Sequence, residues 1–421
     1  MSASPPPLLG PVASSERVQY LDVLRGFALY GVLVANIIWM ACDMVLTPAA
    51  ARQLPTHSVD RVVKYLVVFF IDGKFITLFS FLFAVGFTIQ MQRAVQRGGN
   101  AVSTYARRVA VLMLIGVAHI VFIWFGDILL IYGFLGFALL AMRNWRPGRA
   151  MLVLACLLIL LTRPAFLTVQ KVIAQGHSAH AAAAHPTDET QLQTLAAFRG
   201  GYATVARKNV SIYWRDLFPT GLIAALLGQA LGRFLLGLYV GKRGYVQQID
   251  RYVTAIRRAM PWLLLMGVVG NGVSVAFEWA QTVRGVSANS FWLILLRPIL
   301  DAGVVSLAAF YAGGIAILLQ SARWGPTLTR LAAVGRMALT NYLTQSLVYL
   351  FVLTGAGWGL IGHIGATVCV AITIVLFALQ IVFSAWWLRH YHFGPAEWLW
   401  RSLTYGRIQR MRRDELASVS F

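Results

Sequence analysis

The 421 residues are 58% hydrophobic and only 12% charged, with 36 Lys and Arg against 15 Asp and Glu. Soluble domains carry about 25% charged residues, so a chain of this length has too few charges to cover a water-facing surface. The composition therefore excludes a soluble globular protein. The formal net charge of +21 would suggest nucleic-acid binding in a soluble protein, but here it has another explanation and no nucleic-acid partner is expected.

Apolar runs of about 20 residues, the length that crosses a ~30 Å hydrocarbon core, recur along the chain. They must be helical, because backbone groups in lipid find hydrogen-bond partners only within their own segment. The predicted fold is an all-α, polytopic transmembrane bundle of about ten spans. We place them near 21–41, 66–91, 108–125, 127–142, 150–168, 218–240, 260–280, 292–319, 337–354 and 364–388.

Lysine and arginine are unevenly divided between the two sides that these spans define. With the N-terminus inside, 23 of the 36 fall on the inner side, 12 on the outer side and Arg233 within a span. Cytoplasmic loops of membrane proteins carry such an excess. The bias predicts that both termini are cytoplasmic and that the membrane is a bacterial inner membrane. The inner basic residues are expected to contact phosphates of membrane lipids.

A single membrane domain is predicted at 19–388, with a large outer loop at 169–217. Residues 1–18 are expected to form a disordered cytoplasmic N-terminus, and 389–421 a cytoplasmic tail rich in basic and aromatic residues. The first apolar stretch is longer than the hydrophobic region of a signal peptide and begins with a charged pair. It is therefore interpreted as a retained span.

Ionisable side chains inside a span are costly, so each is a candidate functional residue. His119 lies in the third span, and Asp127 lies at the turn to the fourth, near enough to fold back towards it. A carboxylate beside an imidazole fixes its tautomer and stabilises its charged form, which a general base requires. Asn36 ends the first span at a similar outer depth. The alternative for His119 is a buried imidazole that hydrogen-bonds a neighbouring helix.

Other polar residues in the spans have structural explanations. Arg297 and Asp301 are four residues apart on one helix face, which favours a structural ion pair. Asn341 and Gln345 also share a face, and interhelical hydrogen bonds explain them as well as a functional role does.

A metal site is not favoured by the sequence. The outer loop contains three histidines whose spacing permits metal binding, at positions His177, His180 and His185. Their Ala-rich, low-complexity surroundings favour a flexible loop instead.

Five segments, in order along nearly the whole chain, resemble the YeiB family of bacterial membrane proteins, a family of unknown function. They are LDVLRGFALYGVLVAN at 21–36, KF…LFSFLF at 74–83, H…WFGDIL at 119–129, GRMALTNYLTQS at 335–346 and FGPAEWLWR at 393–401. This family is similar to a broader group of transmembrane acyltransferases, which includes the heparan glucosaminide N-acetyltransferases and bacterial surface-glycan acyltransferases. The resemblance implies their ten- or eleven-helix arrangement.

The resemblance also implies an acyl-CoA-dependent membrane acyltransferase. It would move an acyl group from cytoplasmic acyl-CoA, with acetyl-CoA the expected co-substrate and no metal, to an outer acceptor that is a glycan, a lipid or a small molecule. His119 would take the acceptor proton, Asp127 would orient it, and Asn36 could donate to the oxyanion. Arginines at the inner mouth would attract the CoA phosphates, with positive-inside anchoring as their alternative role: Arg25, Arg93, Arg107 and Arg108.

One departure bears on the catalytic residues. Surface-glycan acyltransferases have an Arg followed, after ten residues, by an essential His, whereas here Arg25 is followed at that distance by Asn36. An amide is not a general base at neutral pH, so His119 is the substitute candidate. The rival function is a transporter or channel-like protein for a small solute, in which the same polar groups line a path. A regulatory or assembly role and a homo-oligomer also stay open.

Overall fold

Helices make up most of the chain that the computed structural model describes, which is residues 19–96, 100–176, 188–284 and 290–413. Within these ranges no element is a β-strand. The predicted all-α, polytopic helical bundle is confirmed, and the chain is a multi-pass membrane protein.

Eight helical stretches in the described ranges are long and apolar enough to cross a membrane, and they fall on eight of the ten predicted spans. They are α1 (Gln19–Ile38) with η2 (Trp39–Asp43), α3 (His57–Phe70) with α4 (Lys74–Gln96), α5 (Ala101–Phe122), α7 (Arg149–Gly176), α10 (Leu222–Lys242), α11 (Ile249–Arg284), α12 (Phe291–Leu319) and α15 (Ala366–His390).

The other two predicted spans are short apolar helices, α6 (Leu129–Ala141), continued by η3 (Met142–Asn144), and α14 (Ala338–Leu353). Sixteen residues rise only about 24 Å, less than the ~30 Å core. Both helices adjoin non-helical segments, 123–128 and 354–365. Such backbone is tolerated at membrane depth only where protein buries it.

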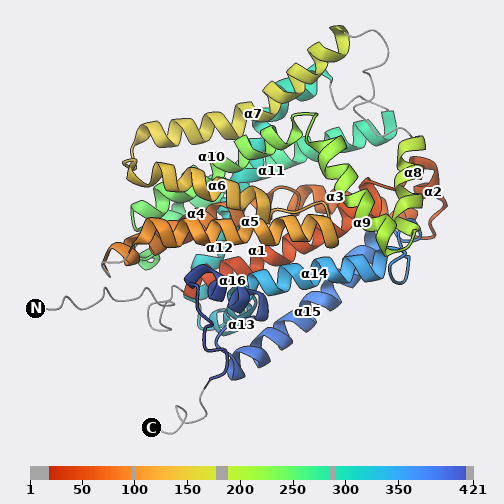
Figure 1. Cartoon of the computed structure of the whole chain (residues 1–421). Coiled ribbons are helices and arrows are strands. Elements are labelled where there is room, and N and C mark those ends of the chain that lie inside the picture. Colours follow the sequence, from red (N-terminus) through yellow and green to blue (C-terminus); the bar gives the residue numbers. More distant parts are fainter. Residues whose placement is uncertain (1–18, 97–99, 177–187, 285–289, 414–421) are drawn as a thin grey trace, which may run out of the picture.

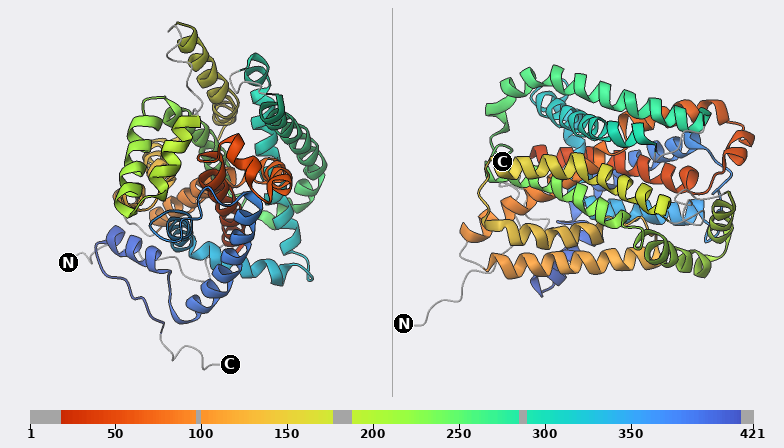
Figure 2. Two further views of the ribbon diagram at one scale, coloured as in Figure 1. Left: turned by 90° about the vertical axis from the view of Figure 1, so that its right-hand side faces the viewer. Right: turned by 90° about the horizontal axis from the view of Figure 1, so that it is seen from above.

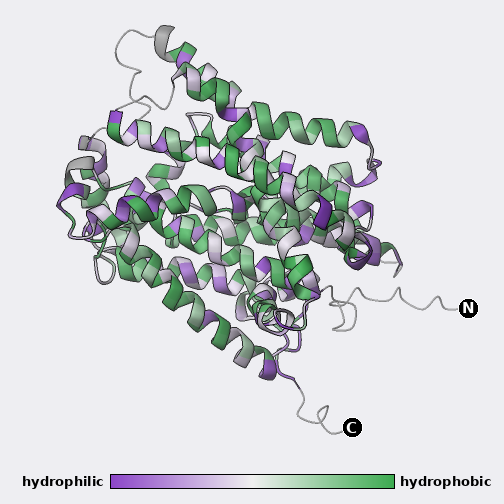
Figure 3. Cartoon of the chain, turned by 180° about the vertical axis from the view of Figure 1, so that it is seen from behind, coloured by the Kyte–Doolittle hydropathy of each residue, from purple (hydrophilic) through white to green (hydrophobic). Residues whose placement is uncertain are grey.

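The bundle has two distinct ends (Figure 1). The start of α1, α13 (Gly325–Arg336) and α16 (Pro395–Tyr405) lie at one end, while α2 (Pro48–Gln53), α8 (Asp188–Arg199) and α9 (Tyr202–Ser211) lie at the other. We call these the α16 end and the α9 end. The long helices run side by side between them (Figure 2), and their surfaces there are mainly hydrophobic (Figure 3).

The predicted span at 66–91 is not one helix, because it is broken at 71–73 between α3 and α4. Gly73 has φ +80°, in the left-handed region that glycine adopts without steric cost. Lys74 Nζ donates to the carbonyl of Val68 across the break at 2.7 Å. An unbroken helix of these 40 residues would be about 60 Å long, twice the hydrocarbon core. The break lets α3 pack against α11 and α15.

The described part of the predicted outer loop is largely helical. Helix α7 continues to Gly176, and α8, α9 and η4 (Ile212–Leu217) follow before α10. The three histidines considered for metal binding lie outside the described residues.

Two glycines set the close approach of α1 to α13. A Cβ added at Gly26 would overlap the backbone carbonyl of Leu331, and one at Gly335 would overlap that of Asp22. Small residues allow helices in membranes to approach closely. Gly26 and Gly335 belong to two of the segments that carry the family resemblance, so the two segments are joined in space.

Gly335→Ala should therefore lower the thermal stability of the purified protein. Overpacking of a close contact costs about 1–3 kcal/mol, and here the clash is with backbone, which cannot rotate away. Gly272→Ala is the matched control, since a Cβ at this helical glycine meets nothing within 4 Å. It should be neutral or slightly stabilising. Equal unfolding temperatures for the two variants would contradict the proposed role of Gly335.

Candidate functional site

A cavity of about 310 Å³ lies between the two halves of the chain. Its walls come from α1, α4, α5 and α6 on one side and from α13, α14 and α16 on the other. The lining runs from the α16 end inwards to Tyr132 and Tyr342. Cavities of ~300 Å³ and more, apolar with a few polar groups, are typical of small-molecule sites.

The rim of the cavity is strongly basic. Among the described residues, five arginines line it, against two carboxylates, Asp22 and Glu397: Arg25, Arg93, Arg108, Arg336 and Arg401. Asp22 is already paired with one of them, since its Oδ1 lies 2.8 Å from Arg25 Nη1. The rim therefore presents net positive charge to anything that enters.

Three of the four arginines predicted to attract phosphates line this rim, namely Arg25, Arg93 and Arg108. Arg107 does not line it, and its Nη1 donates instead to the carbonyl of Thr404 at 3.4 Å. Sequence reasoning missed Arg336 and Arg401. Both lie in segments of the family resemblance, but their distance along the chain from the first three gave no sign that they would converge.

Glu397 fixes one wall of the cavity by capping α14. One carboxylate oxygen accepts from the backbone N–H groups of Leu339 and Thr340 at 2.6 and 3.1 Å, and the other accepts from Thr340 Oγ1 at 2.5 Å. Negative charge is favoured at a helix N-terminus. Burial raises the pKa of the Glu397 carboxyl, and these hydrogen bonds oppose the rise. The contact joins α16 to α14.

The structure brings His119 and Asp127 together. His119 Nδ1 lies 3.1 Å from Asp127 Oδ1, and the two residues are 1% and 5% exposed. The two atoms are not aligned for a hydrogen bond, and neither ring nitrogen has a hydrogen-bond partner among the described residues. Asp127 Oδ2 accepts from the N–H of Leu130 at 2.6 Å, at the start of α6. The carboxylate therefore faces the imidazole and caps a helix as well.

A glycine makes room for this pair. Helix α5 ends just beyond His119, whose carbonyl accepts from the N–H of Trp124 at 2.8 Å. The chain then turns back through Asp127 into α6. A Cβ at Gly116 would lie 2.8 Å from Asp127 Oδ2 and 2.5 Å from the nitrogen of Leu130. Only glycine lets α5 and the start of α6 approach this closely.

The pair lies just beyond the deep end of the cavity, separated from it by Tyr342. The His119 and Tyr342 rings are 5.3 Å apart, and Tyr342 lines the cavity whereas His119 does not. The Tyr342 hydroxyl is buried without a hydrogen-bond partner in the described ranges. Arg108, at the rim, precedes His119 by eleven residues on α5, a rise of about 16 Å.

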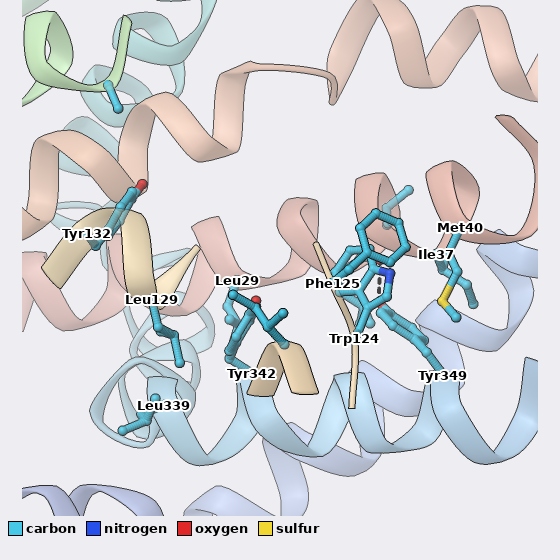
Figure 4. Packing of buried hydrophobic residues seen from close by; sticks show 14 of the residues in the cluster. Leu29, Ile37, Met40, Trp124, Phe125, Leu129, Tyr132, Leu339, Tyr342 and Tyr349 are labelled. Carbon is cyan, nitrogen blue, oxygen red and sulfur yellow. Dashed lines mark hydrogen bonds between the residues drawn. The ribbon is translucent and has the colours of Figure 1, made fainter. Parts of the chain in front are cut away.

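Aromatic side chains fill the bundle between the cavity and the α9 end. Figure 4 shows Leu129, Tyr132 and Tyr342 at the cavity, with Trp124 and Tyr349 beyond them. Trp124 is 1% exposed and contacts Tyr349 edge-on at 6.2 Å between ring centroids. This layer separates the cavity from the α9 end.

Helices α8 and α9 cover the hairpin at 123–128 from the α9 end. Tyr202 Oη donates to the carbonyl of Phe122 at 3.0 Å, and Asn209 Nδ2 donates to that of Ile123 at 3.2 Å. Phe198 packs against Phe125, with ring centroids 6.4 Å apart. Side chains that bind backbone carbonyls have no spacing signature, so the sequence could not predict this cover.

Asn36 is half-buried near the end of α1. Among the described residues, no hydrogen bond joins it to His119 or Asp127. The ring that packs beside the imidazole is that of Tyr342.

Asn341 and Gln345 form interhelical hydrogen bonds, one of the two roles considered for them. Asn341 Nδ2 donates to Ser384 Oγ at 3.0 Å, and Gln345 Nε2 donates to Gln380 Oε1 at 2.8 Å. Both partners lie on α15. These four buried side chains hold α15 against α14, whose other face lines the cavity.

Comparison with known proteins identifies the family of this chain. A family model described as "Protein of unknown function (DUF418)" matches residues 240–407. The chain is 33% identical to the uncharacterized protein YxaH of Bacillus subtilis (strain 168), over 94% of this chain and 96% of that protein. It is 28% identical to the uncharacterized protein YeiB of Escherichia coli (strain K12), over 92% and 96%.

The chain belongs to the YeiB-like family. A third relative, an uncharacterized 39.9 kDa protein of Bacillus acidopullulyticus, is 31% identical over 95% of this chain and 97% of its own. The matched region at 240–407 supplies α13, α14 and α16 to the cavity of this YeiB-like protein, while α1 and α4 to α6 precede it. The site therefore lies between the region that the family model matches and the preceding half of the chain.

Proposed function

We propose that this YeiB-like protein is a membrane acyltransferase that takes an acyl group from cytoplasmic acyl-CoA and gives it to an acceptor on the other side of the membrane. The observation that carries the proposal is the cavity, which has a basic rim and an apolar interior and ends at Tyr342, in ring contact with His119.

The cavity matches the chemistry of acyl-CoA in two respects. CoA carries its phosphates at one end and its thioester at the end of a long flexible arm. Arginine binds phosphate oxygens through a planar, bidentate fork, which suits the rim. Leucine and phenylalanine side chains line the interior, among them Leu82, Phe83 and Leu112, and would surround the arm and the acyl group.

In the proposed reaction His119 acts as general base. Nδ1 faces Asp127, so Nε2 is the nitrogen that takes the proton from the acceptor hydroxyl or amine. The acceptor attacks the thioester carbonyl, the C–S bond breaks, and the CoA thiolate takes the proton back from the imidazolium. Asp127 stabilises the imidazolium. The Tyr342 hydroxyl would donate to the oxyanion, after a side-chain rotation that opens the cavity to His119.

The proposal places the α16 end in the cytoplasm and the protein in a bacterial inner membrane. The support is the excess of Lys and Arg in the segments at this end, which is the pattern of cytoplasmic loops. Acyl-CoA would then enter at the rim from the compartment in which it is made.

A transporter for an organic anion is the second candidate. The aromatic layer around Trp124 and Tyr349 closes the α9 end, and a site open at one side only is also what alternating access requires. Binding of CoA without any transfer of the acyl group would favour this second function.

The orientation can be tested with single cysteines in a background without Cys42, Cys156 and Cys369. Trp358→Cys, 78% exposed in the wild-type position at the α9 end, should react with an impermeant maleimide in intact cells. Gln247→Cys, exposed in the turn after α10, should react only after the cells are opened. The reverse pattern would place the rim outside and exclude cytoplasmic acyl-CoA as donor.

CoA and acetyl-CoA should raise the unfolding temperature of the purified protein, because a ligand that binds only the folded state stabilises it. Arg108→Gln should weaken the apparent affinity about tenfold, the effect of losing one charge-assisted hydrogen bond. Arg107→Gln is the matched control, since Arg107 neighbours Arg108 but does not line the cavity. Equal loss in both variants would indicate general electrostatics instead of a phosphate site.

His119→Ala should lower transfer of label from radioactive acetyl-CoA to membrane acceptors by about 10²–10⁴-fold, the usual contribution of a general base. Asp127→Asn should lower it less, because an amide oxygen can still accept from Leu130 while the charge beside His119 is lost. His363→Ala is the control, as this exposed histidine lies at the α9 end beside Arg199. Undiminished transfer by well-folded His119→Ala would remove His119 from the mechanism.

A further inference from the structure

A second group of charged residues lies between α7, α10 and α12, away from the cavity. We call it the arginine cluster, and it comprises Arg163, Arg233, Arg297 and Asp301. Arg297 Nη2 lies 3.4 Å from Asp301 Oδ1, the ion pair predicted from their spacing. Gln229 Nε2 donates to the other carboxylate oxygen at 3.2 Å. None of these residues lines the cavity.

The arginine cluster has more positive than negative charge. Three guanidinium groups lie within electrostatic reach of one another and, among the described side chains, of a single carboxylate, that of Asp301. Both oxygens of Asp301 are already engaged. The Nε atoms of Arg233 and Arg297 are buried and have no hydrogen-bond partner among the described residues. Unneutralised charge is expensive inside a membrane, so a bound anion would stabilise the cluster.

The cluster opens to the side of the bundle. Arg233 and Asp301 are buried, whereas the Arg297 side chain is 17% exposed and Arg163 is exposed on α7. Because α7 packs against α12, exposed Arg163 and partly exposed Arg297 place the cluster at the surface between two helices that are long and apolar enough to span a membrane.

Helix lengths place the cluster in the half of the membrane nearer the α9 end. Arg163 lies 14 residues after Arg149, a rise of about 21 Å of the ~30 Å core. Arg297 lies six residues after Phe291, where α12 begins at the α9 end, about 9 Å along the helix. Arginine side chains at such depths extend towards the lipid headgroups.

A repeated Arg-Pro step indicates that the site is built into both helices. Arg163 precedes Pro164 inside α7, and Arg297 precedes Pro298 inside α12. Proline removes one backbone hydrogen bond and bends a helix. A bend beside each of these arginines would ease the entry of a headgroup between the two helices.

We propose that the arginine cluster binds the phosphate group of an anionic membrane lipid from the leaflet at the α9 end. Phosphate oxygens match the arginine forks and would engage the unpartnered Nε atoms. The lipid is the source of the phosphate because the open side of the cluster faces the hydrocarbon between spans and not an aqueous cavity. The site is independent of the proposed acyl transfer.

The test is the thermal unfolding of delipidated protein titrated with phosphatidylglycerol or phosphatidylcholine in detergent. Phosphatidylglycerol should stabilise the wild type more strongly. Arg163→Gln and Arg297→Gln should each weaken its apparent affinity about tenfold, whereas Arg297→Lys, which keeps the charge, should lose less. Arg207→Gln, an exposed arginine of α9, is the control and should bind like the wild type.

Asp301→Asn distinguishes a lipid site from a purely structural ion pair. It removes the internal carboxylate that competes with phosphate, so phosphatidylglycerol should bind this variant several-fold more tightly than the wild type. Equal affinity in the wild type, Arg163→Gln and Arg297→Gln would overturn the proposal. Failure of the wild type to prefer phosphatidylglycerol would do the same. Equal stabilisation by inorganic phosphate would show that the cluster binds a soluble anion and not a lipid.

Discussion

The structure depends on burying a short non-helical segment at membrane depth. Residues 123–128 leave backbone groups outside any helix, and lipid offers them no partner. Side chains of α9 bind the carbonyls of Phe122 and Ile123, and Trp124 and Phe125 are almost wholly buried. Helix α9 covers this segment from the α9 end, whereas the basic rim of the cavity lies at the α16 end, so the two ends of the bundle differ.

The same segment explains why an ionisable pair persists in the interior. Asp127 caps α6 and faces His119, so one carboxylate satisfies a helix start and stabilises an imidazole. If Asp127 had a structural role alone, capping α6 would be sufficient and no histidine would be needed beside it. The imidazole adds a buried group whose nitrogens have no hydrogen-bond partner among the described residues. Packing does not explain this cost, whereas the proposed proton transfer would.

Span positions and the His119–Asp127 contact could be predicted, because hydrophobicity and a hairpin are local properties of the sequence. The break at Gly73 escaped prediction, since the apolar pattern continues across it and only backbone conformation distinguishes the two helices. The position of Tyr342 beside His119 was also not predicted, because an aromatic residue in an apolar helix has no sequence pattern that marks it as part of a site. Its position beside His119 depends on how α14 packs against α5, which is a tertiary property.

The positions of the arginines help to distinguish two possible roles, binding of an anionic ligand and anchoring of the chain at the membrane surface. Charge counting treats Arg108 and Arg107 alike, and positive-inside anchoring requires only that each lie on the inner side. In the structure, arginines from α1, α4, α5, α13 and α16 point to one cavity, while their neighbour Arg107 does not line it. Like charges gathered around a confined space repel one another more strongly than charges spread over a surface. An anionic ligand would offset this repulsion, so the convergence favours the proposed binding site.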